Sequence, residues 1–392
     1  MTGSGKKPLP DLWRWVRLGE ICEIIAGQSP PSETYRKTPE GLQFFQGKAD
    51  FGLRHPVARI WCVAPVKVAF PGDILISVRA PVGPTNVADI RCCIGRGLAA
   101  IRPREQADRD FILAALRFYE GELAELGRGS TFGAIKRENL ESLEIPLPPL
   151  SEQKRIAAIL NEQMVAVERA RAAAEAQLEA AKVLPAAYLR AVFKSPEAQQ
   201  WPKVRLGEIL ELRKDVVHPR DNPRGAATFV GLEHLESGTG VRTGSVDVEM
   251  AELTGRKPRF YKGDIVYGYL RPYLNKVWVA EFDGLCSVDQ YVYKVDEKKV
   301  ETDFVAWFMR SPLYLKRAPI KTTPGQLPRI RTEEVASVEV NLPPLPEQRR
   351  VMAVLTEQLT AGEQTHGAVE QQLGTINKLP AALLRRAFSG EL

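Results

Sequence analysis

The chain has 392 residues, of which 44% are hydrophobic, 26% charged and 8% aromatic. This composition is typical of globular proteins and excludes a mostly disordered or collagen-like chain. No run of about 18 apolar residues is present and no apolar core follows the basic N-terminus, so we expect neither a transmembrane helix nor a secretory signal. Five cysteines without C-x-x-C spacing indicate a reduced, cytoplasmic protein, and the net charge of +6 permits a polyanionic partner without requiring one.

After a tail over residues 1–12, residues 13–144 contain short apolar runs broken by glycine and proline. Residues 60–70 and 73–80 have the composition of strands, and residues 111–126 have the pattern of a helix. Gly72, in the block GDI, is expected in a turn that opens a strand. The mixture predicts a compact α/β (α+β) globular domain.

Residues 145–200 are predicted to be mainly helical. Pro148 and Pro149 end the preceding strand, and Ser151 can cap a helix that runs to about residue 183. Such a helix spans about 50 Å at 1.5 Å per residue. Pro185 predicts a kink or a break near its end.

The same order then recurs, which indicates a tandem duplication. The four blocks VRLGEI (16–21), GDI (72–74), PLPPLSEQKR (146–155) and LPAAYLR (184–190) have counterparts at 204–209, 263–265, 341–350 and 379–385. Residues 201–338 therefore form a second globe, with a strand near 276–282 and a helix near 304–317, and residues 339–392 form a second long helix, interrupted at Pro380.

Neither long helix can bury its apolar stripe alone, because apolar residues recur with 3-4 spacing along each of them. The cheapest partner for each helix is the other copy. We therefore predict an antiparallel coiled coil that separates the two globes, in an elongated, pseudo-twofold architecture.

These blocks resemble the specificity (S) subunit of type I restriction–modification systems. The resemblance rests on LPDLWRWVRLGEI at 9–21, GSTFGAIK at 129–136 and IPLPPLSEQKRIAAIL at 145–160, and it extends over about residues 9–390. The second copy departs from the pattern where TPGQLPRI at 323–330 replaces GSTFGAI, and its helix contains Gly362 and Gly374.

The resemblance implies a DNA-reading subunit without catalytic activity. Each globe would be a target recognition domain for one half of a bipartite, asymmetric site in double-stranded DNA. The helices would set the spacing and dock two methyltransferase (M) subunits, which use S-adenosylmethionine to methylate adenine. Restriction (R) subunits, which use ATP and magnesium, would join them.

Base and phosphate contacts need donor side chains on loops that can enter a groove. Arg79 and Arg271, and likewise Lys136 and Arg331, are basic at what the sequence gives as corresponding positions of the two copies. The tyrosines of YGYLRPY fit a strand core as well as a base-stacking surface. Taken singly, each candidate is more often an ordinary surface residue. The candidates are Gln46, Lys48, Arg79, Arg96, Ser130, Thr131, Lys136, Arg220, Tyr269, Arg271, Gln290, Gln326, Arg329 and Arg331.

The starts of the two long helices are candidates for subunit docking, and the alternative is a solvated helix face with paired charges. The docking candidates are Glu152, Gln153, Arg155, Ile156, Leu160, Glu347, Gln348, Arg350, Val351 and Leu355.

Catalytic motifs are missing from the sequence. It contains no phosphate-binding G-x-x-x-x-G-K-[ST] loop, no methyltransferase motif and no paired histidines, so this chain is expected to bind no metal or cofactor. Asp283, Glu297 and Lys299 can be forced into a nuclease-like spacing, but matches of this kind arise readily among 48 acidic and 54 basic residues. The main alternative is a non-catalytic adaptor that binds partners through its coiled coil without reading DNA.

Overall fold

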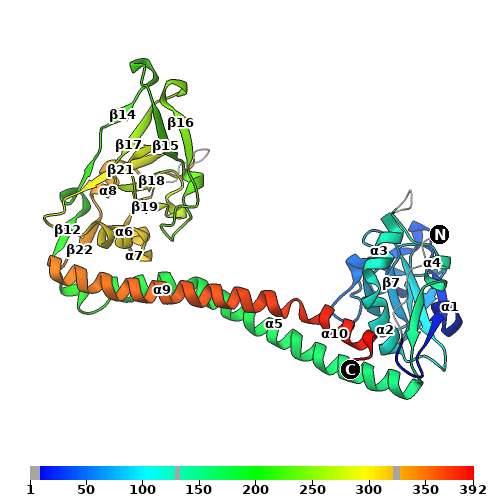
Figure 1. The fold of residues 1–392 in the computed structure, drawn as a ribbon. Coiled ribbons are helices and arrows are strands. Elements are labelled where there is room, and N and C mark those ends of the chain that lie inside the picture. The colour runs from blue at the N-terminus through cyan, green and yellow to red at the C-terminus, as the bar shows by residue number, and fades with distance from the viewer. Residues whose placement is uncertain (1–8, 129–132, 321–326) are drawn as a thin grey trace. The chain divides into compact units, whose positions relative to one another are not determined.

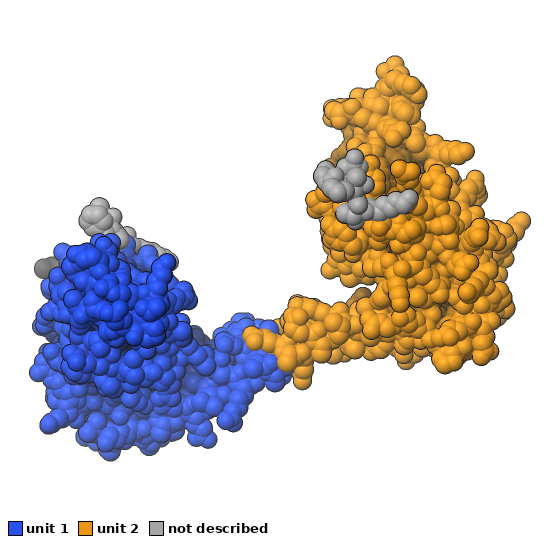
Figure 2. Space-filling model, turned by 180° about the vertical axis from the view of Figure 1, so that it is seen from behind, with its two compact units in different colours: residues 1–174, 372–392 blue, residues 175–371 orange. Residues whose placement is uncertain are grey.

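The computed structural model describes residues 9–128, 133–320 and 327–392. The chain forms two compact units (Figure 2): residues 1–174 with 372–392, and residues 175–371. Each unit contains one mixed α/β globe together with parts of the long helices (Figure 1). The predicted class of globe and the presence of long helices are confirmed.

In unit 1 an inner sheet of four antiparallel strands forms the centre of the globe, in the order β2-β10-β7-β8. Side chains alternate between its two faces: Ile74 and Ile76 of β7 belong to one buried cluster and Leu75 belongs to another. Gly72, with φ of +91°, forms the turn predicted before β7. The strands are β2 (Cys22–Ala26), β7 (Ile74–Ser77), β8 (Thr85–Val87) and β10 (Leu98–Pro103).

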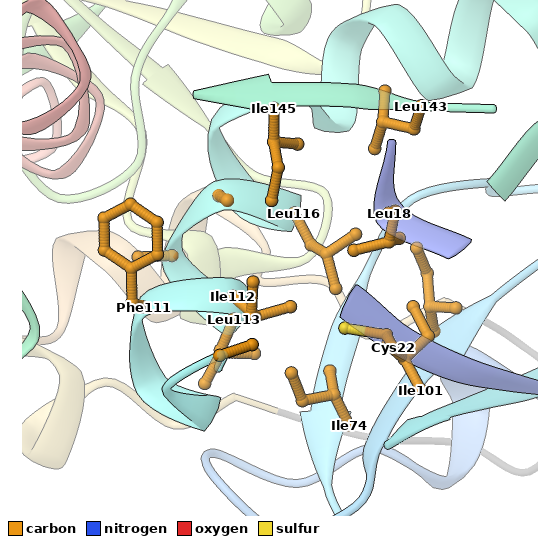
Figure 3. Packing of buried hydrophobic residues seen from close by; sticks show 14 of the residues in the cluster. Leu18, Cys22, Ile74, Ile101, Phe111, Ile112, Leu113, Leu116, Leu143 and Ile145 are labelled. Carbon is orange, nitrogen blue, oxygen red and sulfur yellow. The ribbon is translucent and has the colours of Figure 1, made fainter. Parts of the chain in front are cut away.

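Short helices cover the first face of this sheet. Asp108 caps α2, because its carboxylate accepts the amides of Asp110 and Phe111 at 3.0 Å. Figure 3 shows α2 directing Ile112 and Leu116 toward side chains of the sheet. The helices are α1 (Leu18–Ile21), α2 (Arg109–Phe118), α3 (Glu120–Arg128) and α4 (Arg137–Glu141), and β1 (Arg14–Arg17) pairs with β11 (Glu144–Leu147) beside them.

An outer sheet of five short strands covers the second face, in the order β3-β5-β4-β9-β6. Phe45 and Ile94 from this sheet pack with Leu75. The continuous strand predicted over 60–70 is wrong: two two-residue strands flank a loop, in which Pro65 has no N–H for a ladder. The strands are β3 (Tyr35–Arg36), β4 (Leu42–Phe45), β5 (Trp61–Cys62), β6 (Val68–Ala69) and β9 (Cys92–Ile94).

Unit 2 repeats this three-layer arrangement. Its inner sheet has the order β13-β21-β18-β19 and its outer sheet the order β14-β17-β20-β15-β16. Its strands are β12 (Lys203–Arg205), β13 (Leu210–Leu212), β14 (Val216–Val217), β15 (Ala226–Val230), β16 (Val246–Glu249), β17 (Lys257–Phe260), β18 (Ile265–Gly268), β19 (Val277–Val279), β20 (Gly284–Cys286), β21 (Gln290–Val295) and β22 (Glu339–Asn341). Its short helices are α6 (Thr302–Arg310), α7 (Pro312–Arg317) and α8 (Thr332–Ala336).

The long helices respond differently to their prolines. Helix α5 (Leu150–Phe193) continues through Pro185, so the predicted break is absent there. In the second copy α9 (Leu345–Ile376) stops, and Pro380 lies in the first turn of α10 (Leu379–Ser389), where a missing N–H costs nothing. No helix of the described residues is long and apolar enough to cross a membrane.

Each globe holds the start of one long helix and the end of the other. In unit 1 Ile156 and Leu160 of α5 share a core with Phe388 of α10, whose ring lies 5.3 Å from that of Phe111. In unit 2 Leu355 of α9 shares a core with Phe193 of α5, whose ring lies 5.4 Å from that of Phe304. The ends of the long helices therefore pack into the same core as the short helices and the inner sheet of each globe.

Candidate nucleic-acid interface

In unit 1 the loops that follow three strands meet around one hollow of about 600 Å³. Gln46 and Lys48 follow β4, Arg79 follows β7, and Arg96 follows β9. All four side chains are exposed. The structure thus brings together four of the predicted DNA-contact residues from distant parts of the sequence.

Backbone contacts fix these loops. The Asp50 carboxylate accepts the Gln46 amide at 2.7 Å, and Ser29 Oγ accepts the Arg96 amide at 3.3 Å. A Cβ at Gly97 would lie 2.1 Å from the Gln46 carbonyl oxygen, so only glycine allows the two loops to approach this closely. Ser29 and Ser77, which also line the hollow, were missed because nothing in the local sequence marks them.

The basic side chains of this hollow form no close ion pairs within the part of the chain that the structure describes. Among the residues that the structure describes, no acidic group forms an ion pair with Lys48, Arg79 or Arg96. Asp50, the carboxylate in the lining, is engaged by backbone amides. The hollow therefore offers exposed cationic donors and an amide, which are groups that bind phosphates and base edges.

A β-bridge connects the hollow to the segment that contains Lys136, and we call the row of exposed basic residues from the hollow to Lys136 the basic edge of unit 1. Arg79 forms a β-bridge with Ala134, and the Ile135 amide donates to the Val78 carbonyl at 2.9 Å. Lys136 is exposed at the start of α4. Ser130 and Thr131 lie outside the described residues.

Unit 2 has the same bridge. Leu270 pairs with Arg329, and the Ile330 amide donates to the Tyr269 carbonyl at 3.2 Å. Arg271, Arg329 and Arg331 are exposed along this edge, and Arg331 begins α8 as Lys136 begins α4. Lys136 and Arg331 are thus equivalent, as predicted.

The predicted equivalence of Arg79 and Arg271 is wrong by one residue. Ile74 begins β7 as Ile265 begins β18, and the bridge residues Arg79 and Leu270 follow at the same interval. Arg271 therefore corresponds to Ala80, and its φ of +52° is a left-handed conformation that Arg79 does not share. The two arginines therefore occupy different positions relative to the bridge, Arg79 within it and Arg271 one residue after it.

Aromatic stacking distinguishes the edge of unit 2. Tyr269 stacks on Tyr291 with ring centroids 4.3 Å apart. Partial burial, followed by the charge of Asp289, raises the pKa of Tyr269, while nearby Arg329 and Arg256 oppose the rise. Arg256 was not among the predicted residues, because it precedes β17 in a segment with no recognisable block.

Three other candidates of unit 2 do not join this edge. Gln290 is buried, and its Oε1 accepts the Ser287 amide at 2.9 Å, so its prediction as an exposed base-reading residue is wrong. Arg220 lies beside Asp221 in a 3₁₀ turn between β14 and β15 of the outer sheet. Gln326 lies outside the described residues.

The helix starts also require a correction. The structure buries six of the ten docking candidates inside this chain, where they cannot form an exposed face. The remaining four form two ion pairs. Glu152 pairs with Arg155 in α5 at 2.7 Å, and Glu347 pairs with Arg350 in α9 at 2.6 Å. The buried six are Gln153, Ile156, Leu160, Gln348, Val351 and Leu355.

The two globes share one design, and each has exposed basic side chains at one edge and packs on parts of the long helices, an arrangement suited to a protein that binds a polyanion with two modules. Comparison with known proteins makes the class specific. Residues 10–171 match the family model described as "Type I restriction modification DNA specificity domain". Over this stretch the chain is similar to the specificity subunits of type I restriction–modification systems.

Two relatives show how far the similarity extends. The MjaX specificity subunit of Methanocaldococcus jannaschii is 48% identical over 152 residues, which are 38% of this chain and 36% of that subunit. The EcoDI specificity subunit of Escherichia coli is 25% identical over 423 aligned positions, which cover 99% of this chain and 90% of that subunit. The first alignment thus leaves most of the MjaX subunit unmatched.

Among solved structures, the HsdS subunit from Thermoanaerobacter tengcongensis is 58% identical over 41% of this chain and 40% of that chain, with a TM-score of 0.38. The specificity subunit from M. genitalium is 17% identical over 96% of both chains, with a TM-score of 0.40.

Proposed function

We propose that this chain is the DNA-specificity subunit of a type I restriction–modification complex, and that each globe reads one half of a bipartite site. The observation that carries this function is the hollow of unit 1, where Lys48, Arg79 and Arg96 are exposed and form no close ion pair with a carboxylate among the described residues. Arginine in such a loop can bind guanine in the major groove, and lysine favours phosphate.

The edge of unit 2 supports the same role with different chemistry. Arg271, Arg329 and Arg331 are exposed there beside the stacked pair Tyr269 and Tyr291. Because the two edges present different side chains, the two half-sites differ, and the recognised sequence is asymmetric.

The partners and cofactors follow from the similarity to type I specificity subunits. Two methyltransferase subunits dock on the long helices and supply S-adenosylmethionine-dependent adenine methylation, and restriction subunits supply ATP- and magnesium-dependent cleavage. This chain itself is non-catalytic and works in the cytoplasm. Since the helix residues buried in the globes are unavailable, docking uses the exposed faces of α5 and α9, which form an antiparallel coiled coil.

The function is tested by expressing the chain with its methyltransferase subunits and mapping methylated adenines across a genome. We expect one bipartite motif with a fixed spacer, and no methylation when this chain is omitted. A matched binding assay at physiological salt compares that motif with a scrambled duplex, because salt suppresses the nonspecific component. Equal affinity for both duplexes, or methylation without a motif, would contradict the proposal and favour the non-reading adaptor.

A further inference from the structure

A buried glutamine joins α5 to the globe of unit 1. Gln153 is 1% exposed, and its side-chain amide makes three hydrogen bonds. Its Oε1 accepts the Asp108 amide at 2.8 Å, and its Nε2 donates to the carbonyls of Gln106 at 3.1 Å and Pro148 at 2.9 Å.

The same joint occurs in unit 2. Gln348 is fully buried; its Oε1 accepts the Glu301 amide at 2.8 Å, and its Nε2 donates to the carbonyls of Lys299 at 3.1 Å and Pro343 at 2.8 Å. The corresponding distances differ by at most 0.1 Å between the two joints. We call these two sets of contacts the glutamine joints.

Only glutamine fits both sets of contacts. The primary amide donates twice and accepts at the same time, whereas glutamate cannot donate twice and asparagine is one methylene shorter. Methionine keeps the length but leaves one backbone amide and two carbonyls without their partner, which is costly for buried groups.

The joints connect the long helices to the residues that precede α2 and α6. Asp108 caps α2, whose Phe111 packs against Phe388 of α10, and Glu301 precedes α6, whose Phe304 packs against Phe193 of α5. Each glutamine thus ties the first turn of a long helix to the loop before the globe's main helix. Three bonds from one planar amide restrict rotation as well as separation.

The arginine two residues later adds a weaker contact to the returning helix end. Arg155 Nη2 donates to the Leu392 carbonyl oxygen at 2.6 Å, and Arg350 Nη2 donates to Glu197 Oε1 at 3.2 Å. Both arginines are exposed, and exposed ion pairs contribute little. The buried glutamine is therefore the main constraint at each joint.

We propose that Gln153 and Gln348 are positioning residues for DNA recognition: they hold each globe at a fixed angle on its helix and so restrict the spacer length that the subunit accepts. The inference rests on the proposed function. It also accounts for the glutamine of the PLPPLxEQxR block by a contact within this chain.

The test uses the complete complex with its methyltransferase subunits and the variants Gln153→Met, Gln348→Met and Gln153→Glu. Methylation is mapped at sites whose spacer is the wild-type length, one base pair shorter or one longer. We expect each variant to raise the share of off-length methylation at least about tenfold, with both half-site sequences unchanged. The exposed Gln200, which lies outside both long helices and both basic edges, provides the matched control Gln200→Met, which keeps the wild-type ratio.

Hydrogen exchange of the full-length protein gives a readout in each joint. In Gln153→Met the Asp108 amide exchanges at least about tenfold faster while the Glu301 amide keeps its protection, and Gln348→Met reverses the pattern. Each unit is thus the reference for the other.

The possible failures are distinguishable. Absence of a bipartite motif in the wild type refutes the proposed function itself. If the wild type has a bipartite motif and the variants keep the wild-type preference for spacer length, the positioning role is overturned. This holds even if hydrogen exchange at the joint is faster in the variants. Loss of protection throughout both units also overturns it, because the glutamines would then be general stability residues.

Discussion

The inner sheets of the two units match strand for strand, whereas the outer sheets do not. The order β2-β10-β7-β8 corresponds to β13-β21-β18-β19, with every pairing antiparallel. The outer sheets share a three-strand kernel with one parallel and one antiparallel pairing, β4-β9-β6 and β15-β20-β17. Beyond it, unit 1 adds β5 and β3, while unit 2 adds β16 on one side and β14 on the other.

This difference separates two tasks. The inner sheet and its helices must fit the long helices, so the glutamine joints and the phenylalanine contacts recur in both units. The outer sheet contributes to no such joint among the described residues, and its loops carry much of the variation. The proposed asymmetry of the two half-sites follows because the inner sheets are alike in the two units while the outer sheets and their loops differ.

The largest effect is expected from changing the length of a long helix while leaving both globes intact. Insertion of four residues after Ala172 adds about one turn, or about 6 Å, to α5. Under the proposed function the spacer between the half-sites changes and neither half-site does. Methylation mapping checks this, and an unchanged spacer would refute the idea that the helix sets the distance.

The buried aspartate of each GDI block tests whether the two inner sheets are equally dependent on it. Asp73 accepts the Phe70 amide and pairs with Arg102 at 2.8 Å, and Asp264 accepts the Tyr261 amide and pairs with Arg213 at 2.6 Å. Arg102 lies on β10, but Arg213 follows β13, so the partner comes from a different strand in each unit.

We expect Asp73→Ala and Asp264→Ala each to lower the free energy of unfolding of their own unit by about 2–4 kcal/mol, because a buried amide and an arginine lose their acceptor. Hydrogen exchange at Phe70 and Tyr261 measures each unit separately. Equal destabilisation of both units by one substitution would contradict the independence of the two sheets.

Substitutions at the basic edges should separate the two half-sites. Arg79→Ala is expected to relax recognition in one half-site, and Arg271→Ala in the other, each by about 1–3 kcal/mol if the arginine contacts a base. Lys136→Ala and Arg331→Ala provide equivalent controls, expected to weaken binding to all sequences and to reduce the salt slope by about 1 if they contact phosphate. Binding to a panel of duplexes with single base changes, at two salt concentrations, distinguishes these outcomes. Relaxation of both half-sites by one arginine would contradict separate reading.

The sequence predicted the duplication, the globe class and the long helices, because these depend on repeated blocks and on helical periodicity. It also placed Gln46, Lys48, Arg79 and Arg96 on loops, but it could not show that they surround one hollow, since strand order in the sheets depends on nonlocal pairing. The burial of Gln153 and Gln348 was missed because a polar residue at a helix start normally faces solvent. The register error at Arg271 arose from aligning R-x-P with R-P, where only the bridge to Arg329 shows the correct correspondence.

The smallest effect concerns the glycines that distinguish α9 from α5. Gly362 occupies the position that Val167 holds in the first copy, and an added Cβ would meet no atom within 4 Å. It borders a hollow of about 390 Å³ within unit 2, which Trp307 and Leu359 also line. Because glycine in a helix interior costs about 1 kcal/mol relative to alanine, Gly362→Ala should raise the free energy of unfolding of unit 2 by about 0.5–1 kcal/mol.

Gly390 is the contrasting control for this substitution. It ends α10 with φ of +78°, and a Cβ there would lie 2.3 Å from Pro10 Cγ, so Gly390→Ala should destabilise unit 1. Chemical denaturation followed by unit-resolved hydrogen exchange measures both effects. If Gly362→Ala stabilised unit 2 but reduced methylation, the open space beside α9 would be needed in the assembled complex; if methylation were unchanged, the glycine would be a tolerated weakness of the second helix.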